Sequence, residues 1–416
     1  MDLPGMMRVR QEVEAPVLND IEKDIQARIE ALHLDAWVKA GDTVAVGCSS
    51  RGIANYAVIV KSVVDALLNL KLIPFLFPAM GSHGSASPEG QRAVLESYGI
   101  TEASMGVPIK SALDVVQIGE TEDRIPVYID RLASDADHIV LVNRIKMHTE
   151  FDFEIESGLM KMMAIGLGKK KGATRYHQGI MVHGYPRVIQ SVARQVLKRR
   201  KILFGVGIVE NALSQTSRIG VFTADELEDG EKVLLVEAKR LALGLPFDEA
   251  DVLIIDEMGK DISGTGFDTK VVGRILMPLV AEEPKSPRVK RIVVCSLTEK
   301  TGGNADGVGI ADFVTRRLVD NIDRTALYVN AIAGAEPEHA KIPLTLKNDR
   351  EAVEVAIGSV GLIPRDQLGI MHIRNTLQLG EVAVSEAYAE EVKKRDDLEV
   401  VEDVRPMRFD VQGNLK

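Results

Sequence analysis

The sequence predicts an α/β protein of two domains, each built on a mostly parallel or mixed sheet flanked by helices. Two observations support this prediction. Short apolar runs that suit buried strands alternate with longer segments that suit helices, and this alternation is typical of parallel sheets covered on both faces. At 416 residues the chain is longer than most single hydrophobic cores, so two domains are expected.

The first half of the chain contains both kinds of segment. Runs rich in Val, Ile, Leu and Phe are expected to form buried strands at 43–48, 73–78, 136–145 and 202–211. Longer segments of helical character are expected to form helices at 55–70, 88–98, 155–167, 187–199 and 226–242. These elements predict a first domain over residues 1–246, and most of the candidate site residues considered below lie in it.

A second series of apolar segments begins after LGLPFDEA (243–250), where the helical pattern of the first half ends. Strands and helices alternate again, over 250–258, 291–297, 311–322, 325–332, 351–360 and 368–373. This series predicts a second domain over 247–416 that completes an active-site cleft between the domains. Two Gly- and Asp-rich loops, 259–270 and 299–309, interrupt it, and loops at strand ends are where α/β folds usually bind ligands.

The composition argues against several classes of protein. A net charge of −10 gives no chain-wide basic footprint for nucleic acid. Two cysteines, Cys48 and Cys295, argue against a disulfide scaffold and fit a reducing compartment. The first residues show no signal-peptide core, and no run of eighteen apolar residues suits a membrane span. We expect a cytoplasmic protein that acts on a small molecule, with a homo-oligomer as an open alternative.

Two loops that follow predicted strands carry the first candidate site residues. Arg51 lies in CSSRGIANY (48–56), where backbone N–H groups before a helix favour an anion and a guanidinium can clamp a carboxylate. The alternative is a surface arginine on a helix-capping turn. His83 lies in a Gly- and Ser-rich loop with little apolar surface around it, so it is either a site histidine or an exposed loop histidine.

His148 follows the predicted strand 136–145 and repeats the placement of His83. The positive charges of Arg144 and Lys146 favour a neutral imidazole, as a proton acceptor requires. Two histidines at the ends of two strands of one sheet could flank a single substrate carbon. Such a pair suits removal of hydrogen from one face of that carbon and its return to the other.

Lys161 lies among methionines in ESGLMKMMAIGLG (156–168). A lysine with apolar neighbours loses hydration and becomes nucleophilic, although a helix lysine that extends its amine to water is the alternative. His177 lies sixteen residues further on and His183 six beyond it, which is not a helical zinc spacing. The spacing therefore gives only a weak signal for a conventional metal site.

Together these segments resemble the nickel-pincer lactate racemases and their homologues, the 2-hydroxyacid racemases and epimerases. The residues that match the family pattern are Arg51, His83 in GSHG, His148 in HTEF, Lys161 in GLMK, and His177. Their order and approximate spacing agree with the family. The resemblance covers most of residues 45–185 and is thinner after 246.

The resemblance implies a cofactor and a reaction. The cofactor would be a nickel-pincer nucleotide, a pyridinium-3,5-bisthiocarboxylate mononucleotide, joined covalently to Lys161, with its nickel also held by His177. It would accept a hydride from C2 of a 2-hydroxyacid while His83 or His148 takes the hydroxyl proton. The keto acid would then receive the hydride on its other face, so the activity implied is an isomerase that inverts C2.

The cofactor phosphate and the substrate have further candidate contacts under this resemblance. GLGKKKGATR (166–175) would hold the phosphate through Gly166, Gly168, Lys169 and Arg175. Lys270 in the second domain would contact a more oxygenated acid. We expect a substrate other than lactate itself, because this sequence has a cysteine, at position 48, where the family often has an acidic residue.

Two other classes of function stay open at the level of sequence. One is a binding or regulatory protein that keeps the fold and has lost the cofactor. The other is a lyase or hydrolase with a divalent metal held by His148, His177 and His183. Nickel together with a cofactor mass on Lys161 would distinguish the racemase from both.

Overall fold

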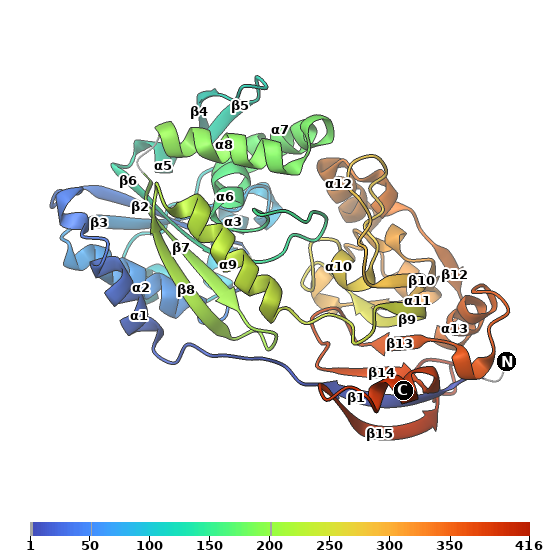
Figure 1. The fold of residues 1–416 in the computed structure, drawn as a ribbon. Helices are drawn as coiled ribbons and strands as arrows, with labels where there is room; N and C mark the ends of the chain where they lie inside the picture. Colours follow the sequence, from blue (N-terminus) through green and yellow to red (C-terminus); the bar gives the residue numbers. More distant parts are fainter. Residues whose placement is uncertain (1–2, 51, 200–201) are drawn as a thin grey trace. The chain divides into compact units, whose positions relative to one another are not determined.

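The computed structural model describes residues 3–50, 52–199 and 202–416, and its elements are labelled in Figure 1. The chain forms two compact units. One unit spans Glu14–Ala242, and the other combines the N-terminal residues up to Val13 with Leu243–Lys416. Both contain a sheet with parallel strands and flanking helices, so the α/β class predicted from the sequence is confirmed.

The unit Glu14–Ala242 is built on a five-stranded sheet in the order β3-β2-β6-β7-β8. Its strands are β2 (Thr43–Cys48), β3 (Ile73–Pro78), β6 (His138–Arg144), β7 (Ile202–Glu210) and β8 (Thr216–Thr223). The first four in this order pair in parallel, and they are the four buried runs expected from the sequence. The antiparallel partner of β7, β8, was not expected. A separate hairpin pairs β4 (Val115–Glu120) with β5 (Pro126–Asp130).

Helices cover both faces of this sheet (Figure 1). Apart from the helical run 159–183, the α-helices of the unit are α1 (Ile21–Glu30), α2 (Tyr56–Asn69), α3 (Pro88–Ser97), α4 (Glu102–Met105), α5 (Arg131–Asp135), α8 (Tyr185–Arg199) and α9 (Leu227–Leu241). On one face, Phe204 and Val206 of β7 join the core formed with α1 and α2. On the other, Leu159 and Leu227 pack against the next residue of the strand, Gly205. The alternation follows from the period of two in a strand.

One interrupted helical run, residues 159–183, carries Lys161. It begins as α6 (Leu159–Lys161), continues as the π-helical segment Met162–Gly166, and continues as α7 (Leu167–His183). Within α7, Lys169 has φ 51° and ψ −162°, so the run is two helices joined at a kink. The π-helical segment packs against both α7 and α8. Single π-helical turns occur frequently at functional sites.

The second unit is built on an eight-stranded mixed sheet in the order β12-β11-β10-β9-β13-β14-β1-β15. Its strands are β1 (Gly5–Gln11), β9 (Glu249–Met258), β10 (Arg288–Leu297), β11 (Phe313–Thr315), β12 (Leu344–Leu346), β13 (Ile370–Ile373), β14 (Glu381–Ser385) and β15 (Leu398–Pro406). Its helices are α10 (Thr269–Val272), α11 (Arg316–Asp320), α12 (Arg324–Gly334), α13 (Asp349–Gly358) and α14 (Ala389–Val392). The five strands from β12 to β13 are parallel, and the other three are antiparallel.

The N-terminal strand β1 departs from the predicted division at residue 246, because it pairs with β14 and β15 of the second unit. Met7 and Val9 point into that unit's core, while Arg8 and Arg10 face outward. Arg10 bonds Glu381 at 2.8 Å and Glu399 at 3.0 Å across the strands. The alternation of GMMRVRQ is compatible with any sheet edge, so the sequence alone does not say which sheet this strand joins.

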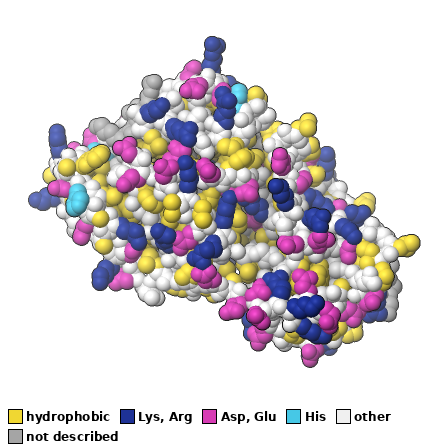
Figure 2. All heavy atoms as spheres, viewed as in Figure 1, with side chains coloured by type: hydrophobic (Ala, Val, Ile, Leu, Met, Phe, Trp, Pro, Cys, Tyr) yellow, Lys and Arg dark blue, Asp and Glu magenta, His cyan; other side chains and the backbone are white. Residues whose placement is uncertain are grey.

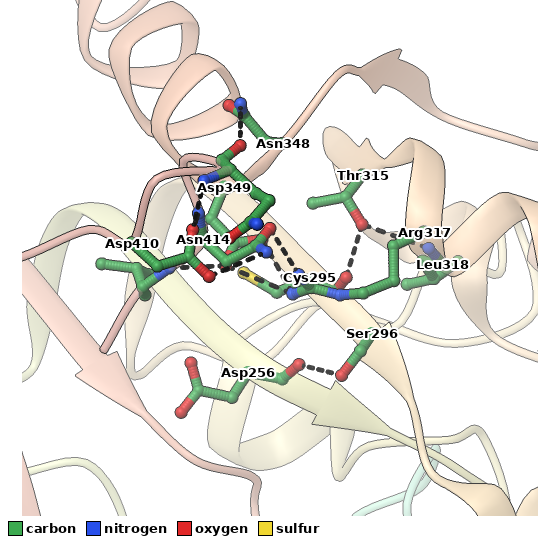
Figure 3. Close-up of polar contacts among 12 residues, drawn as sticks. Asp256, Cys295, Ser296, Thr315, Arg317, Leu318, Asn348, Asp349, Asp410 and Asn414 are labelled. Carbon is green, nitrogen blue, oxygen red and sulfur yellow. Dashed lines mark hydrogen bonds and ion pairs between the residues drawn. The ribbon is translucent and has the colours of Figure 1, made fainter.

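Partly buried polar contacts hold the C-terminal segment onto the second unit (Figure 3). Arg317 Nη2 lies 2.9 Å from Asp349 Oδ1, and its Nη1 donates to Asn414 Oδ1 at 2.7 Å. The other carboxylate oxygen of Asp349 accepts from the backbone N–H of Leu415 at 2.8 Å. Asp410 Oδ1 accepts the backbone N–H of Asn414 at 2.8 Å. The last residues of the chain are therefore part of this unit's packing.

The surface carries charges of both signs. Figure 2 shows Lys and Arg interspersed with Asp and Glu on the face drawn. Within the described ranges, no helix combines the length and apolarity that crossing a bilayer requires.

Candidate active site

The candidate site lies in the loops that follow β2, β3 and β6 in the unit Glu14–Ala242. These strands are parallel neighbours, and Cys48 at the end of β2 pairs with Pro78 at the end of β3 and with Val142 of β6. Their carboxyl ends therefore open at one edge of the sheet, where open α/β sheets usually bind ligands. The first loop contains Arg51, which lies outside the described residues, so its proposed role as a carboxylate clamp stays a prediction.

His83 lies in the loop after β3 and is exposed. Its Nδ1 contacts the hydroxyl of Ser50 from the loop after β2. The backbone carbonyl of Ser50 accepts from Tyr98 Oη at 2.9 Å, which fixes that residue. A serine hydroxyl can donate or accept, so this contact admits either neutral tautomer of His83. Nε2 of His83 can therefore accept a proton while Nδ1–H donates to Ser50.

His148 lies in the loop after β6 and is buried, with 8% of its surface exposed. Its Nδ1 accepts the backbone N–H of Glu150 at 3.1 Å, so a neutral ring carries its proton on Nε2. The ring lies 5.1 Å from Phe151 and 4.7 Å from Tyr185, measured between centroids. The contact with Glu150 therefore favours the neutral tautomer of His148 with its proton on Nε2, and the predicted role of His148 as a proton acceptor stays a prediction.

Tyr185 connects His148 with Lys161. The Lys161 ammonium nitrogen lies 5.8 Å from the centroid of the ring that also contacts His148. The Tyr185 hydroxyl donates to the carbonyl of Glu156 at 2.5 Å, and burial raises the pKa of Tyr185 well above its usual value, so it stays a neutral phenol. His148 and Lys161, both predicted from the sequence, thus contact the same aromatic ring at the start of α8.

Glu156 holds the loop that carries His148. Its side chain is fully buried, and Oε2 accepts the backbone N–H of His148 at 2.6 Å. Its Oε1 accepts the N–H of Phe153 at 3.3 Å and lies 2.6 Å from Lys239 Nζ on α9. A buried carboxylate is stable only when it is paired and hydrogen-bonded, and here both oxygens are.

Glu231 of α9 holds the start of the helical run that carries Lys161. It is fully buried, and its Oε2 accepts the backbone N–H of Met160 at 2.8 Å. Burial raises the pKa of Glu231 to about 7, although the hydrogen bond from the backbone N–H of Met160 opposes the shift. Gly158 is required beside it, because a Cβ there would lie 2.3 Å from Glu231 Oε1.

The loop of His83 packs directly against the π-helical segment. Gly81 donates its N–H to the carbonyl of Gly166 at 3.4 Å. A Cβ on Gly166 would lie 2.6 Å from the carbonyl oxygen of Ala79, so only glycine allows this approach without displacing the backbone. The loop after β3 and the run that carries Lys161 are therefore in contact.

Comparisons with known proteins show which family and which fold the chain is similar to. Residues 6–187 match the family model described as the lactate racemase N-terminal domain. This segment belongs to the lactate racemase family. The chain also shares its fold with the lactate racemase apoprotein from Thermoanaerobacterium thermosaccharolyticum, at 12% identity and a TM-score of 0.53, over 89% of this chain and 94% of that chain. The family resemblance predicted from the sequence is confirmed.

A protein from Thermotoga maritima matches at 14% identity and a TM-score of 0.48, over 68% of this chain and 71% of that chain. No curated protein sequence matches the chain.

Within this lactate racemase family segment, the residues expected to bind a phosphate have other contacts. Gly166 packs on Ala79, and a Cβ on Gly168 would lie 2.9 Å from the Tyr176 ring. Lys169 is fully buried, and its ammonium lies 3.0 Å from Asp130 Oδ2. These glycines allow close packing of the helical run, and the charge of Lys169 is neutralised inside the fold. Gly166, Gly168 and Lys169 were expected to bind the cofactor phosphate, but in the structure they make packing and ion-pair contacts within the fold.

Three other predicted residues lie at separate places. Arg175 is exposed on α7 and donates to Gln178 at 3.4 Å. His177 is half-buried on the same helix, which continues from Lys161 through the π-helical segment. Lys270 is half-buried on α10 of the second unit, where its backbone N–H donates to Asp268 at 3.0 Å. Their roles in binding nickel, cofactor and substrate stay predictions.

The alternative metal site of His148, His177 and His183 lacks a suitable geometry. Among the described residues, these three do not bring a nitrogen each within 4.8 Å of one another. His183 instead lies 3.9 Å from Asp123, which also pairs with Arg187 at 2.6 Å. The three histidines expected to hold a divalent metal are therefore not grouped among the described residues.

A further link at this edge of the sheet was missed by sequence reasoning. Arg144, at the end of β6, forms an ion pair with Glu210, at the end of β7. The other oxygen of Glu210 accepts the backbone N–H of Ala54 at 2.6 Å, in the loop after β2. The sequence shows Arg144 only as a charge near His148. Its guanidinium joins the end of β6 to the end of β7, and Glu210 extends this link to the loop after β2.

Proposed function

We propose that this protein is a racemase or epimerase that inverts C2 of a 2-hydroxyacid by reversible hydride transfer, with a nickel-pincer nucleotide attached to Lys161. The observation that supports it best is the shared contact of His148 and Lys161 with the ring of Tyr185. His83 lies at the same edge of the sheet, in a loop that packs on the run carrying Lys161. This constellation lies in a segment of the lactate racemase family.

The residues present fit such a cofactor. Lys161 is half-buried between the buried Met160 and Met162, which suits an amine that forms a covalent bond in a partly desolvated setting. His177 offers an imidazole, which suits nickel. Lys161 would carry the cofactor and His177 would ligate its metal. When bound, the cofactor supplies the hydride acceptor for C2 of the substrate.

The chain's own residues would handle the hydroxyl proton. His83 can accept it at Nε2 while Nδ1–H donates to Ser50. His148, with Nδ1 occupied by the N–H of Glu150, presents an Nε2–H donor to the substrate oxygen and must exchange that contact before it can act as a base. The two histidines are therefore inequivalent, and each serves one enantiomer under different constraints.

The test uses protein loaded with the cofactor in a host that makes it. We expect nickel and a cofactor mass on Lys161, and inversion at C2 for one or more acids in a panel of 2-hydroxyacids. Hydride transfer keeps the original hydrogen at C2, so inversion in D2O should proceed without deuterium entering that carbon. Exchange of deuterium into C2 would refute hydride transfer. Lys161→Ala should lose the covalent adduct, and retention of full activity and cofactor in this variant would refute the attachment.

Two histidine variants test the proton transfer. His83→Ala and His148→Ala should each lower turnover on the order of 10²–10⁴-fold, the usual contribution of a positioned acid or base. The losses should differ between the two directions, while the equilibrium constant stays fixed. His138→Gln is the matched control, because His138 lies at the opposite end of β6 and pairs with Asp42 at 3.0 Å. Near-normal turnover in both alanine variants would contradict the assignment.

A further inference from the structure

Lys169 lies within GLGKKKGATR, yet its ammonium points into the fold. We propose that Lys169 is a positioning residue for His83, which it holds through Gln91. The inference rests on the proposed function, since it matters for catalysis only if His83 moves the substrate proton. The contacts themselves belong to the apoprotein and can be tested without activity.

The ammonium of Lys169 donates two hydrogen bonds and forms an ion pair with a third group. It donates to the carbonyl of Pro78 at 2.5 Å and to Gln91 Oε1 at 3.1 Å. It also lies 3.0 Å from Asp130 Oδ2. Lys169 and Asp130 are both fully buried, so the pair is stable only while these contacts are kept. Pro78 is the last residue of β3, so its carbonyl lies at the start of the loop that carries His83.

Gln91 transmits this contact to His83. Its side chain is fully buried, and Nε2 donates to the carbonyls of Gly81 at 3.0 Å and of His83 at 3.2 Å. An ammonium can only donate, so the amide oxygen must face Lys169. The amide nitrogen must then face the two carbonyls. Lys169 therefore selects the one amide orientation that holds the backbone of His83.

The backbone of Lys169 is shaped for this contact. Its φ of 51° lies in the left-handed region, which is uncommon for a residue with a side chain, and it interrupts the helical run at that point. Lys169 lies eight residues after Lys161 on the same run. The neighbouring exposed lysines Lys170 and Lys171 show no such burial. The kink thus places one lysine of three where it holds the His83 loop against the run that carries Lys161.

Three variants separate positioning from stability. Gln91→Glu keeps an acceptor for the ammonium and can strengthen that contact, but a carboxylate has no hydrogen to donate to Gly81 and His83. Lys169→Met removes the ammonium. Asp130→Asn weakens the buried ion pair and leaves the Gln91 contacts in place. Lys171→Met, on the exposed side of the same run, is the matched control.

The first readout is the imidazole signals of His83 in the apoprotein, by NMR with labelled histidine and assignment from His83→Gln. We expect these signals to shift or split in Gln91→Glu and Lys169→Met, while the His138 signals stay in place. Asp130→Asn should lower the unfolding midpoint in urea and leave the His83 signals close to those of the wild type. If Lys169→Met fails to fold, Gln91→Glu still decides, because it retains the ammonium and its partners.

The second readout is kinetics of the loaded enzyme. Gln91→Glu should lower kcat on the order of 10²-fold with a smaller change in KM, because a displaced acid/base group costs about that much. Unshifted His83 signals in Gln91→Glu overturn the inference whatever the activity. Equal shifts in Asp130→Asn and Gln91→Glu also overturn it, since they would indicate a merely structural role. A wild-type enzyme that inverts no acid in the panel would count against the proposed function, while the NMR result stands.

Discussion

Replacing Glu231 with glutamine tests the buried carboxylate at the start of the Lys161 run. One oxygen of Glu231 accepts the N–H of Met160 at 2.8 Å, and Oε1 has no hydrogen-bond partner among the described residues. Burial raises the pKa of this carboxyl from an ordinary 4.5 to about 7. The glutamine keeps the shape and one acceptor but does not titrate. Comparing the two proteins therefore isolates the effect of ionising this group.

The magnitude follows from the difference between the two states. The folded pKa lies above the unfolded pKa, so between pH 4.5 and 7 the native state binds more protons than the unfolded chain. The stabilisation that this provides is complete below pH 4.5 and is lost as the pH rises through 7. At about 1.4 kcal/mol per pH unit, the loss between pH 5 and pH 8 is about 2.5 kcal/mol.

The assay is urea unfolding of the apoprotein at pH 5, 6, 7 and 8. The free energy of unfolding of Glu231→Gln relative to the wild type should rise by about 2.5 kcal/mol from pH 5 to pH 8. Asp229→Asn is the control, because it removes an exposed carboxylate from the same helix α9. Parallel pH profiles for Glu231→Gln and the wild type would refute the reasoning, because they would show that Glu231 titrates alike in both states.

Two further predictions concern packing in the two units. Gly166→Ala should lower the free energy of unfolding by about 1–3 kcal/mol, because the new Cβ would lie 2.6 Å from the Ala79 carbonyl oxygen. Urea unfolding measures this loss, with Gly244→Ala as the control, because a Cβ on Gly244 meets no atom within 4 Å. A loss no larger than that of the control would contradict the prediction. Asp349→Ala should cost about 1–3 kcal/mol, because it removes the buried partner of Arg317. Limited proteolysis should then cleave the C-terminal segment sooner, and unchanged cleavage would count against its role.

The sequence predicted strands and loops correctly where the pattern of neighbouring residues determines them. The apolar runs at 43–48 and 73–78 form β2 and β3 with the predicted bounds, because a buried parallel strand requires continuous apolar residues. The loop positions of His83 and His148 followed from the strands that precede them, β3 and β6. The partners of β1 could not be predicted from its local pattern. The pattern fits any sheet edge, and the strands that pair with β1 lie more than 370 residues away in the sequence.

The contacts that join the site could not be predicted in this way. Tyr185 begins a helix after the segment 166–183, and nothing in its local pattern indicates that its ring meets both His148 and Lys161. The segment GLGKKKG suggested a phosphate loop, because glycines and lysines often form one. In the structure Gly168 makes room for Tyr176, and Lys169 turns inward at the kink. Composition does not tell which lysine of three points into the core.

The position of Lys161 is fixed from both directions along its own run. Before it, Glu231 receives the N–H of Met160. After it, Gly166 packs on the loop of His83. Lys169, at the kink, donates to the carbonyl of Pro78 at the start of that loop. Every one of these contacts is made by the chain itself, so the lysine, the loop and the run form one preorganised part of the unit. A substitution at either end should therefore displace the residues proposed for chemistry without touching them directly.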